Sequence, residues 1–220
     1  TWFGKEDGDV LYSRDGKNWA EVPAGGGVSQ SPYQQDLIGN DVIFLGTPGS
    51  QIRRTDNITV PNFEGAVSGD GVGACQWIAV GPGTQCVART TIQLRTSPDG
   101  SAWTNNDASA PALWSSIGSG AFRYSPTAGL YCSMGTTFNA VGQKDQYWTS
   151  ANRINWTQRT FPEDWPGQGQ TTIDFFEDNG SIVVMALSNG NTYTSTDLVN
   201  WTLRDTNAFG TAGLCWNPIL

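Results

Sequence analysis

One short turn sequence recurs five times along the 220-residue chain and constrains its fold more than any other feature. Each copy centres on an Asp or Asn, usually with a Ser two residues earlier and a Trp four residues later. The five centres are 41, 43, 53 and 45 residues apart, at Asp15, Asp56, Asp99, Asn152 and Asp197. A repeat of this length, built from short segments between turns, predicts one small β-sheet for each copy.

The segments that flank each turn have the composition of strands, and Gly, Asn and Pro punctuate them where tight turns are needed. In the last repeat the expected strands are 172–176, 182–187, 192–195 and 200–203. The same template predicts first strands near 33–38, 74–80 and 121–126, and second strands near 42–46, 85–89 and 130–134. Four strands in a repeat of this period, here labelled A to D from the inside outward, are typical of a β-propeller blade.

The first repeat lacks its innermost strand, because residues 1–4 already match a second strand. The segment 212–217 near the C-terminus resembles residues 73–77 of the third repeat and is expected to supply the missing strand. Such a closure leaves no open sheet edge. We therefore expect an all-β fold, a five-bladed β-propeller of four-stranded antiparallel blades, which forms a single domain over residues 1–220.

Composition narrows the classes of partner. The net charge of −8 and the pI of about 4.3 disfavour binding to nucleic acid, whose phosphates an acidic surface repels. The longest apolar run, 182–187, is too short to cross a bilayer, so no membrane insertion is expected. The chain has neither an initiator Met nor a signal peptide, and we expect a processed protein or a piece of a longer chain or multimer.

No cofactor or metal is expected, because the chain has no His and its four Cys residues lack the close spacing of metal ligands. The cysteines are Cys75, Cys86, Cys132 and Cys215, all on expected A or B strands. Cys75 and Cys86 are placed so that a disulfide across one hairpin is an alternative, which requires a specific separation of the two Cα atoms. Small buried thiols are the simpler interpretation.

The recurrent turn resembles the Asp-box, or bacterial neuraminidase repeat, of the form Ser-x-Asp-x-Gly-x-x-Trp. The copies at Asp15 and Asp99 carry all four residue types, whereas the copy at Asp197 lacks the Gly, Asn152 replaces the Asp in its copy, and Asp56 alone remains in the second. The resemblance implies a turn between strands C and D in which the five centres are structural and lie on the face opposite a ligand site. It also implies that a Trp packs against the neighbouring blade, at Trp19, Trp103, Trp156 and Trp201.

The resemblance to the sialidase scaffold does not extend to its catalytic residues. In sialidases, as the resemblance implies, three Arg residues point inward. Arg159 and Arg204 are expected on outer D strands, which leaves Arg123 and Arg89 near the axis. Glycosidases that use two central carboxylates are an alternative, and the catalytic candidates on or beside A strands are Asp36, Asp174, Glu177 and Asp178. No second carboxylate lies at an equivalent position in the third repeat, the fourth repeat or the closing strand, so catalysis is the less favoured interpretation.

Long Gly-rich connections with isolated aromatic residues favour recognition instead, because binding residues concentrate on loops of a rigid scaffold. The expected ligand-binding residues are Trp114, Trp165, Phe63, Phe138, Asp164 and Lys144. Aromatic faces beside polar groups suit sugar rings, which predicts a lectin-like module or the receptor-binding head of a phage tail fibre or bacterial adhesin. The expected partner is a glycan or another cell-surface receptor, at an extracellular or virion surface. A glycoside hydrolase and a protein-interaction scaffold are the alternatives.

Overall fold

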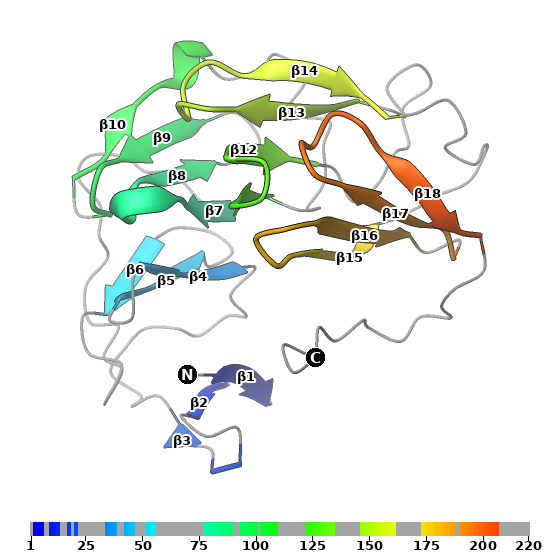
Figure 1. Ribbon diagram of the computed structural model, residues 1–220. Helices are drawn as coiled ribbons and strands as arrows, with labels where there is room; N and C mark the ends of the chain where they lie inside the picture. The colour runs from blue at the N-terminus through cyan, green and yellow to red at the C-terminus, as the bar shows by residue number, and fades with distance from the viewer. Residues whose placement is uncertain are drawn as a thin grey trace. The chain divides into compact units, whose positions relative to one another are not determined.

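The computed structural model of the chain describes residues 2–6, 9–13, 17–18, 20–21, 34–38, 42–46, 52–55, 77–89, 93–100, 102–109, 122–134, 146–161, 173–187 and 190–206. The chain divides into two compact units, Thr1–Ala108 and Ser109–Leu220. Every sheet in the described residues is antiparallel, and its strands follow one another in chain order (Figure 1). The only helical elements there are two short 3₁₀ turns, η1 (Pro82–Thr84) and η2 (Asp107–Ser109).

The first unit contains three sheets. Two of them have three strands each, namely β1 (Trp2–Glu6), β2 (Asp9–Ser13) and β3 (Ala20–Glu21), then β4 (Gln34–Ile38), β5 (Val42–Gly46) and β6 (Ile52–Thr55). The third has four strands, which are β7 (Trp77–Val80), β8 (Cys86–Arg89), β9 (Leu94–Ser97) and β10 (Thr104–Asn105). Within this unit β4 and β5 lie beside β7, so the innermost strands of consecutive repeats are neighbours.

The second unit contains two sheets of four strands. One consists of β11 (Phe122–Ser125), β12 (Leu130–Ser133), β13 (Gln146–Ser150) and β14 (Thr157–Thr160). The other consists of β15 (Ile173–Asp178), β16 (Val183–Leu187), β17 (Thr192–Ser195) and β18 (Thr202–Asp205). The A and B strands expected for the second, third and fourth repeats are confirmed, and so is the order of strands in the last repeat.

Three strand boundaries of the last repeat differ from the expectation by two residues. The first strand, β15, ends at Asp178 rather than at residue 176, and β18 ends at Asp205 rather than at residue 203. The last strand, β18, begins at Thr202 rather than at residue 200. The backbone N–H of Asn200 donates to Oδ1 of Asp197, at 2.8 Å, so this residue belongs to the turn rather than to the strand. The expected C-D turn is therefore two residues longer than its sequence pattern indicates.

The core of the second unit lies between its two sheets and is rich in aromatic and sulfur-containing side chains. The ring of Phe161, which follows β14, lies 4.3 Å from that of Tyr147 and 5.8 Å from that of Trp201, measured between ring centroids. Val183 and Met185 of β16 are fully buried in the same cluster. Burying a side chain of this size stabilises the fold by about 1.5–3 kcal/mol, so this cluster holds the two sheets together.

Candidate functional site

The described box turns, centred on Asp99, Asn152 and Asp197, share one hydrogen-bond pattern. In each turn the Ser two residues before the centre accepts the backbone N–H of the central residue at 3.3 Å. The central side chain then accepts backbone N–H groups from the residues that follow it, at 2.8–3.4 Å. An Asn serves as well as an Asp because only its carbonyl oxygen is needed. These hydrogen bonds hold the turn together, and the structural role of the three centres stays a prediction that they suit.

The residue directly after each centre has a positive φ, which is 77° at Gly100, 69° at Arg153 and 55° at Leu198. The residue that must adopt a positive φ therefore lies one residue closer to the centre than the Gly of the Asp-box form. The Trp is also one residue closer to the centre than in that form. A left-handed conformation costs a side chain about 1–2 kcal/mol. Leu198 is fully buried, and burial of a Leu, about 1.5–3 kcal/mol, offsets that cost. This exchange explains how the last turn tolerates the loss of Gly.

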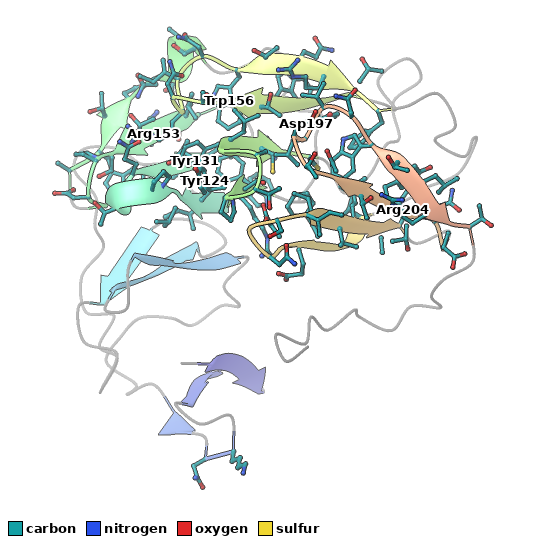
Figure 2. All side chains as sticks on the ribbon, viewed as in Figure 1. Tyr124, Tyr131, Arg153, Trp156, Asp197 and Arg204 are labelled. Carbon is teal, nitrogen blue, oxygen red and sulfur yellow. The ribbon has the colours of Figure 1, made fainter. Side chains whose placement is uncertain are left out.

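In two of the turns the indole N–H of the box Trp donates a hydrogen bond to the backbone carbonyl of the residue that follows the box centre. Trp103 donates to the carbonyl of Gly100 at 3.2 Å, and Trp156 donates to the carbonyl of Arg153 at 3.0 Å, with both members of the second pair labelled in Figure 2. The ring of Trp156 stacks on Phe122 of its own sheet, with centroids 6.0 Å apart, whereas the sequence predicts packing against a neighbouring blade. The short turn keeps this indole against its own backbone, which explains the difference.

In the last turn a tyrosine from the neighbouring sheet takes part. The hydroxyl of Tyr147 donates to the carbonyl of Leu198 at 2.7 Å and accepts the indole N–H of Trp201 at 3.1 Å. Trp201 therefore packs against the neighbouring sheet, as expected for the box Trp. Burial raises the pKa of Tyr147 to about 12, and the hydrogen bond from Trp201 opposes this rise.

The Asp197 carboxylate accepts hydrogen bonds from Ser195, Val199 and Asn200. The backbone N–H of Asn200 is the main cause that lowers its pKa to about 2, and desolvation, the next largest effect, opposes it. The Val199 N–H, the Asn200 amide and the Ser195 hydroxyl lower the pKa further. Figure 2 labels Asp197 in the turn between β17 and β18. At neutral pH the carboxylate is ionised and accepts hydrogen bonds from the residues of its own turn, so it suits a structural role.

A second repeated contact joins the two outer strands of each four-stranded sheet. The donor is the side chain seven residues after each described box centre, and the acceptor is the hydroxyl of the Thr three residues before that centre. The pairs are Asn106 with Thr96 at 2.8 Å, Arg159 with Thr149 at 3.1 Å, and Arg204 with Thr194 at 2.8 Å. The expected position of both Arg residues on outer strands is confirmed. The Thr partners are a signal in the sequence that the motif analysis missed.

Asp178, at the end of β15, connects the two sheets of the second unit. Its carboxylate accepts the hydroxyls of Ser125 and Thr127, the backbone N–H of Thr127 at 3.2 Å and that of Gly180 at 2.8 Å. Four donors from two turns converge on this one side chain. The carboxylate is thus engaged as a link between the β11–β12 and β15–β16 turns.

The next candidate, Glu177, is half-exposed and lies 3.9 Å from the guanidinium of Arg123 on β11. Because adjacent residues of a strand face opposite sides, Glu177 and Asp178 do not form a facing pair of carboxylates. The backbones of Asp36 and Asp174 lie in β4 and β15, but their side chains are outside the described part of the chain. Arg89, the other expected axial Arg, is buried, and its guanidinium lies 4.3 Å from the ring centroid of Trp77.

Asp107 also has a structural contact. It forms an ion pair with Arg95, whose side chain is only 6% exposed, and accepts the backbone N–H of Leu94 at 2.8 Å. The short η2 turn thereby fastens the connection after β10 onto β9. Among the described residues, no group of three or more Cys, Asp or Glu side chains is arranged to hold a metal ion.

Cys86 and Cys132 are both fully buried, in agreement with the interpretation as buried thiols. Burial raises the pKa of Cys132 to about 12. The Cys86 thiol donates to the carbonyl of Thr84 at 3.1 Å. Cys86 keeps its thiol proton for this hydrogen bond, which is contrary to the alternative of a Cys75–Cys86 disulfide. Cys75 and Cys215 themselves lie outside the described residues.

The expected ligand-binding residues Trp114, Trp165, Phe63, Phe138, Asp164 and Lys144 lie outside the described residues, as do the box residues Asp15, Asp56 and Trp19. The segment 212–217, expected to close the ring, lies outside them too. These assignments therefore stay predictions. The described part of the chain contains no helix of the length and apolar character that a membrane-spanning segment needs.

Neither the known protein families nor the curated proteins contain a match to this sequence. Solved structures do match: the extracellular domain of the putative hybrid two-component system BT4673 from B. thetaiotaomicron (TM-score 0.62, 10% identity, 96% of this chain) and YCF48 bound to D1 peptide (TM-score 0.55, 18% identity, 90% of this chain). PorZ, a surface component of the type-IX secretion system of Porphyromonas gingivalis, matches with a TM-score of 0.56 and 11% identity over 90% of this chain. The chain spans 29%, 61% and 24% of these three structures, respectively. The structural neighbours are β-propeller-like proteins, and the likeness shows that this chain has an all-β, propeller-like fold.

Proposed function

We propose that the chain is a non-catalytic recognition domain, a five-bladed β-propeller that binds its ligand at the end of the sheets opposite the box turns. The observation that carries this proposal is that described Asp side chains take part in structural contacts. Asp107, Asp178 and Asp197 are each engaged in contacts that hold turns or sheets together. Such engagement suits a rigid scaffold better than a site for acid and base chemistry on a bound ligand.

Strand directions support the choice of face. Tyr131 pairs with Ser150 and Val183 pairs with Ser195, so the A-B turns and the box turns share one end of each sheet in the second unit. The connecting segments 110–121, 135–145 and 162–172 join these strands at the other end. Those segments carry Trp114, Phe138, Lys144, Asp164 and Trp165. Phe63 belongs to a corresponding connection in the first unit.

A cell-surface glycan is the proposed ligand, because indole and phenyl faces stack on the C–H faces of sugars while nearby polar groups bind hydroxyls. A polypeptide ligand is the second candidate, favoured by the structural likeness to YCF48, a protein solved with a bound peptide. Recognition of either kind suits the head of a phage tail fibre or a bacterial adhesin, at an extracellular or virion surface. The chain would then be one part of a longer protein or a multimer.

Glycan and peptide arrays probed with the intact protein test the proposal, with the glycan spots analysed for cleavage products. Trp114→Ala and Trp165→Ala are expected to abolish binding. Ile154→Ala is the matched control, since Ile154 is an exposed apolar residue on a box turn, and it should bind like the wild type. Release of sugar products would indicate a glycosidase, binding to peptides alone would indicate the second candidate, and silence on both arrays would overturn the proposal.

Ring closure has its own test, because it assigns the segment 212–217 to the edge of β1 (residues 2–6). A paramagnetic or fluorescent label pair at residues 4 and 214 should report a short separation in the folded protein. Removal of residues 212–220 should lower the melting temperature and expose β1 to hydrogen exchange. A long separation between the labels would contradict closure even if ligand binding is confirmed.

A further inference from the structure

The turn between β15 and β16 contains an Asn-Gly pair, Asn179–Gly180, whose polar groups are hydrogen-bonded within the turn. The backbone N–H of Gly180 donates to Oδ1 of Asp178 at 2.8 Å. The side-chain carbonyl of Asn179 accepts the backbone N–H groups of Ser181 and Ile182, each at 2.9 Å. Asn179 and Gly180 are both exposed, so water reaches the pair.

We propose that Asn179 is a self-modification site, at which the chain cyclises to a succinimide and then deamidates. The nitrogen of Gly180 attacks Cγ of Asn179, and its proton passes to the carboxylate of Asp178. The Cγ–Nδ2 bond then breaks, and ammonia leaves with that proton. Water, the one co-reactant, opens the ring to give aspartate or isoaspartate. The proposal is independent of what the chain binds.

Each polar contact of the turn matches one requirement of this reaction. A nitrogen nucleophile needs a base within hydrogen-bond reach, and Asp178 lies there. The attack places negative charge on Oδ1 of Asn179, where two backbone N–H groups already converge as they do in an oxyanion hole. Gly180 has a φ of 83°, and apart from its two chain neighbours no residue has an atom within 4 Å of the place where a Cβ would be, so this side of the nucleophile is open.

The base is held in place from the neighbouring sheet. Ser125 and Thr127 donate to Asp178 from the β11–β12 turn, which fixes its carboxylate beside the Gly180 nitrogen. Positioning of this kind is what distinguishes a catalytic group from a group that merely lies nearby. Isoaspartate would lengthen the backbone of the turn that carries Asp178. The modification would therefore alter the junction between the two sheets.

A second Asn-Gly pair in the same sheet provides an internal control. The N–H of Gly190 donates to the backbone carbonyl of Leu187 at 2.9 Å, a neutral acceptor that is no base. Asn189 itself lies outside the described residues. In the unfolded chain the two dipeptides are chemically equivalent, so any difference in rate between them in the folded protein comes from the fold.

The experiment incubates the full chain at neutral pH, folded and in denaturant, and follows ammonia loss and amide-to-acid conversion by mass spectrometry. Cleavage after Arg159 and Arg204 yields one peptide with both pairs, and its fragmentation assigns each site. In the folded protein Asn179 should react at least about tenfold faster than Asn189, a modest share of the roughly 100-fold that a positioned base or oxyanion donor supplies. In denaturant the two rates should be similar.

Asp178→Asn separates catalysis from simple exposure. It should slow the reaction at Asn179 in the folded protein, because it replaces the base, and leave the rate at Asn189 unchanged. A faster reaction in this variant, or equal rates at the two sites in the folded wild type, would overturn the proposal. The wild-type comparison stands by itself if the variant does not fold.

Discussion

The hydroxyl of Tyr147 lies between the indole of Trp201 and the carbonyl that this indole would otherwise bind. In the turns at Asp99 and Asn152, the Trp N–H reaches the carbonyl after the box centre directly. In the last turn Tyr147 accepts from Trp201 and donates to Leu198, so a contact within one sheet has become a contact between two. A local turn motif here contributes to the packing of neighbouring sheets.

Tyr147→Phe should destabilise the protein by about 2 kcal/mol, because it leaves a buried N–H and a buried C=O without their shared partner. Chemical denaturation measures the loss. Tyr124→Phe, at a half-exposed position on β11, is the matched control and should change stability much less. Equal effects of the two variants would contradict the bridging role of Tyr147.

The same tyrosine predicts a loss of stability in alkali. The folded pKa of Tyr147, about 12, lies above the ordinary value of 10.0, so its contribution is complete below pH 10 and is lost as the pH rises towards 12. The free energy of unfolding, measured from pH 9 to 12, should fall less steeply in Tyr147→Phe than in the wild type. Parallel curves would show that Tyr147 does not retain its proton in the fold.

Asp197→Asn should reduce the loss of stability in acid. The folded pKa of about 2 lies below the ordinary 3.8, so the stabilisation by this carboxylate is present above pH 3.8 and lost as the pH falls towards 2. The variant should keep the turn, as Asn152 does naturally. Asn152→Asp is the reciprocal control and should steepen the acid limb of the denaturation profile. The idea fails if neither exchange changes that limb.

Asp107→Ala should cost about 3 kcal/mol, because it removes a carboxylate that pairs with a nearly buried guanidinium. Asp107→Asn should cost less, since its carbonyl still accepts the N–H of Leu94. Thermal and chemical unfolding of the two variants give this order directly. A cost as low as that of an ordinary surface ion pair, about 1 kcal/mol or less, would mean that the remaining contacts of Arg95, such as its hydrogen bond to the Leu94 carbonyl, are sufficient.

Cys132 should not react with a thiol reagent at pH 8 while the protein is folded. Its pKa of about 12 keeps it protonated, and burial blocks access to the thiol. Alkylation followed by mass spectrometry of the peptide that contains Cys132 measures the extent of reaction. The same peptide from denatured protein is the positive control, and rapid alkylation in the folded state would contradict the burial.

Much of the scaffold could be predicted from the sequence, because turn residues and hydrophobic alternation are local signals. The spacing of the box centres located β5, β8 and β12. Contacts between distant residues left no such signal. Nothing around Asp178 indicates that its partners are Ser125 and Thr127, and Tyr147 carries no local sign that its hydroxyl reaches the turn after β17. The aromatic residues of the proposed binding loops have no periodic pattern, so their contacts could not be derived either.

The link that Asp178 makes has a consequence for how the second unit opens. Its carboxylate joins a turn of β11–β12 to a turn of β15–β16, and the Tyr147 hydroxyl joins the same two sheets elsewhere. Two such ties make it costly for one sheet to detach while the other stays intact. Amide hydrogens of β12 and β16 should therefore exchange with solvent in a single cooperative event, as members of one foldon.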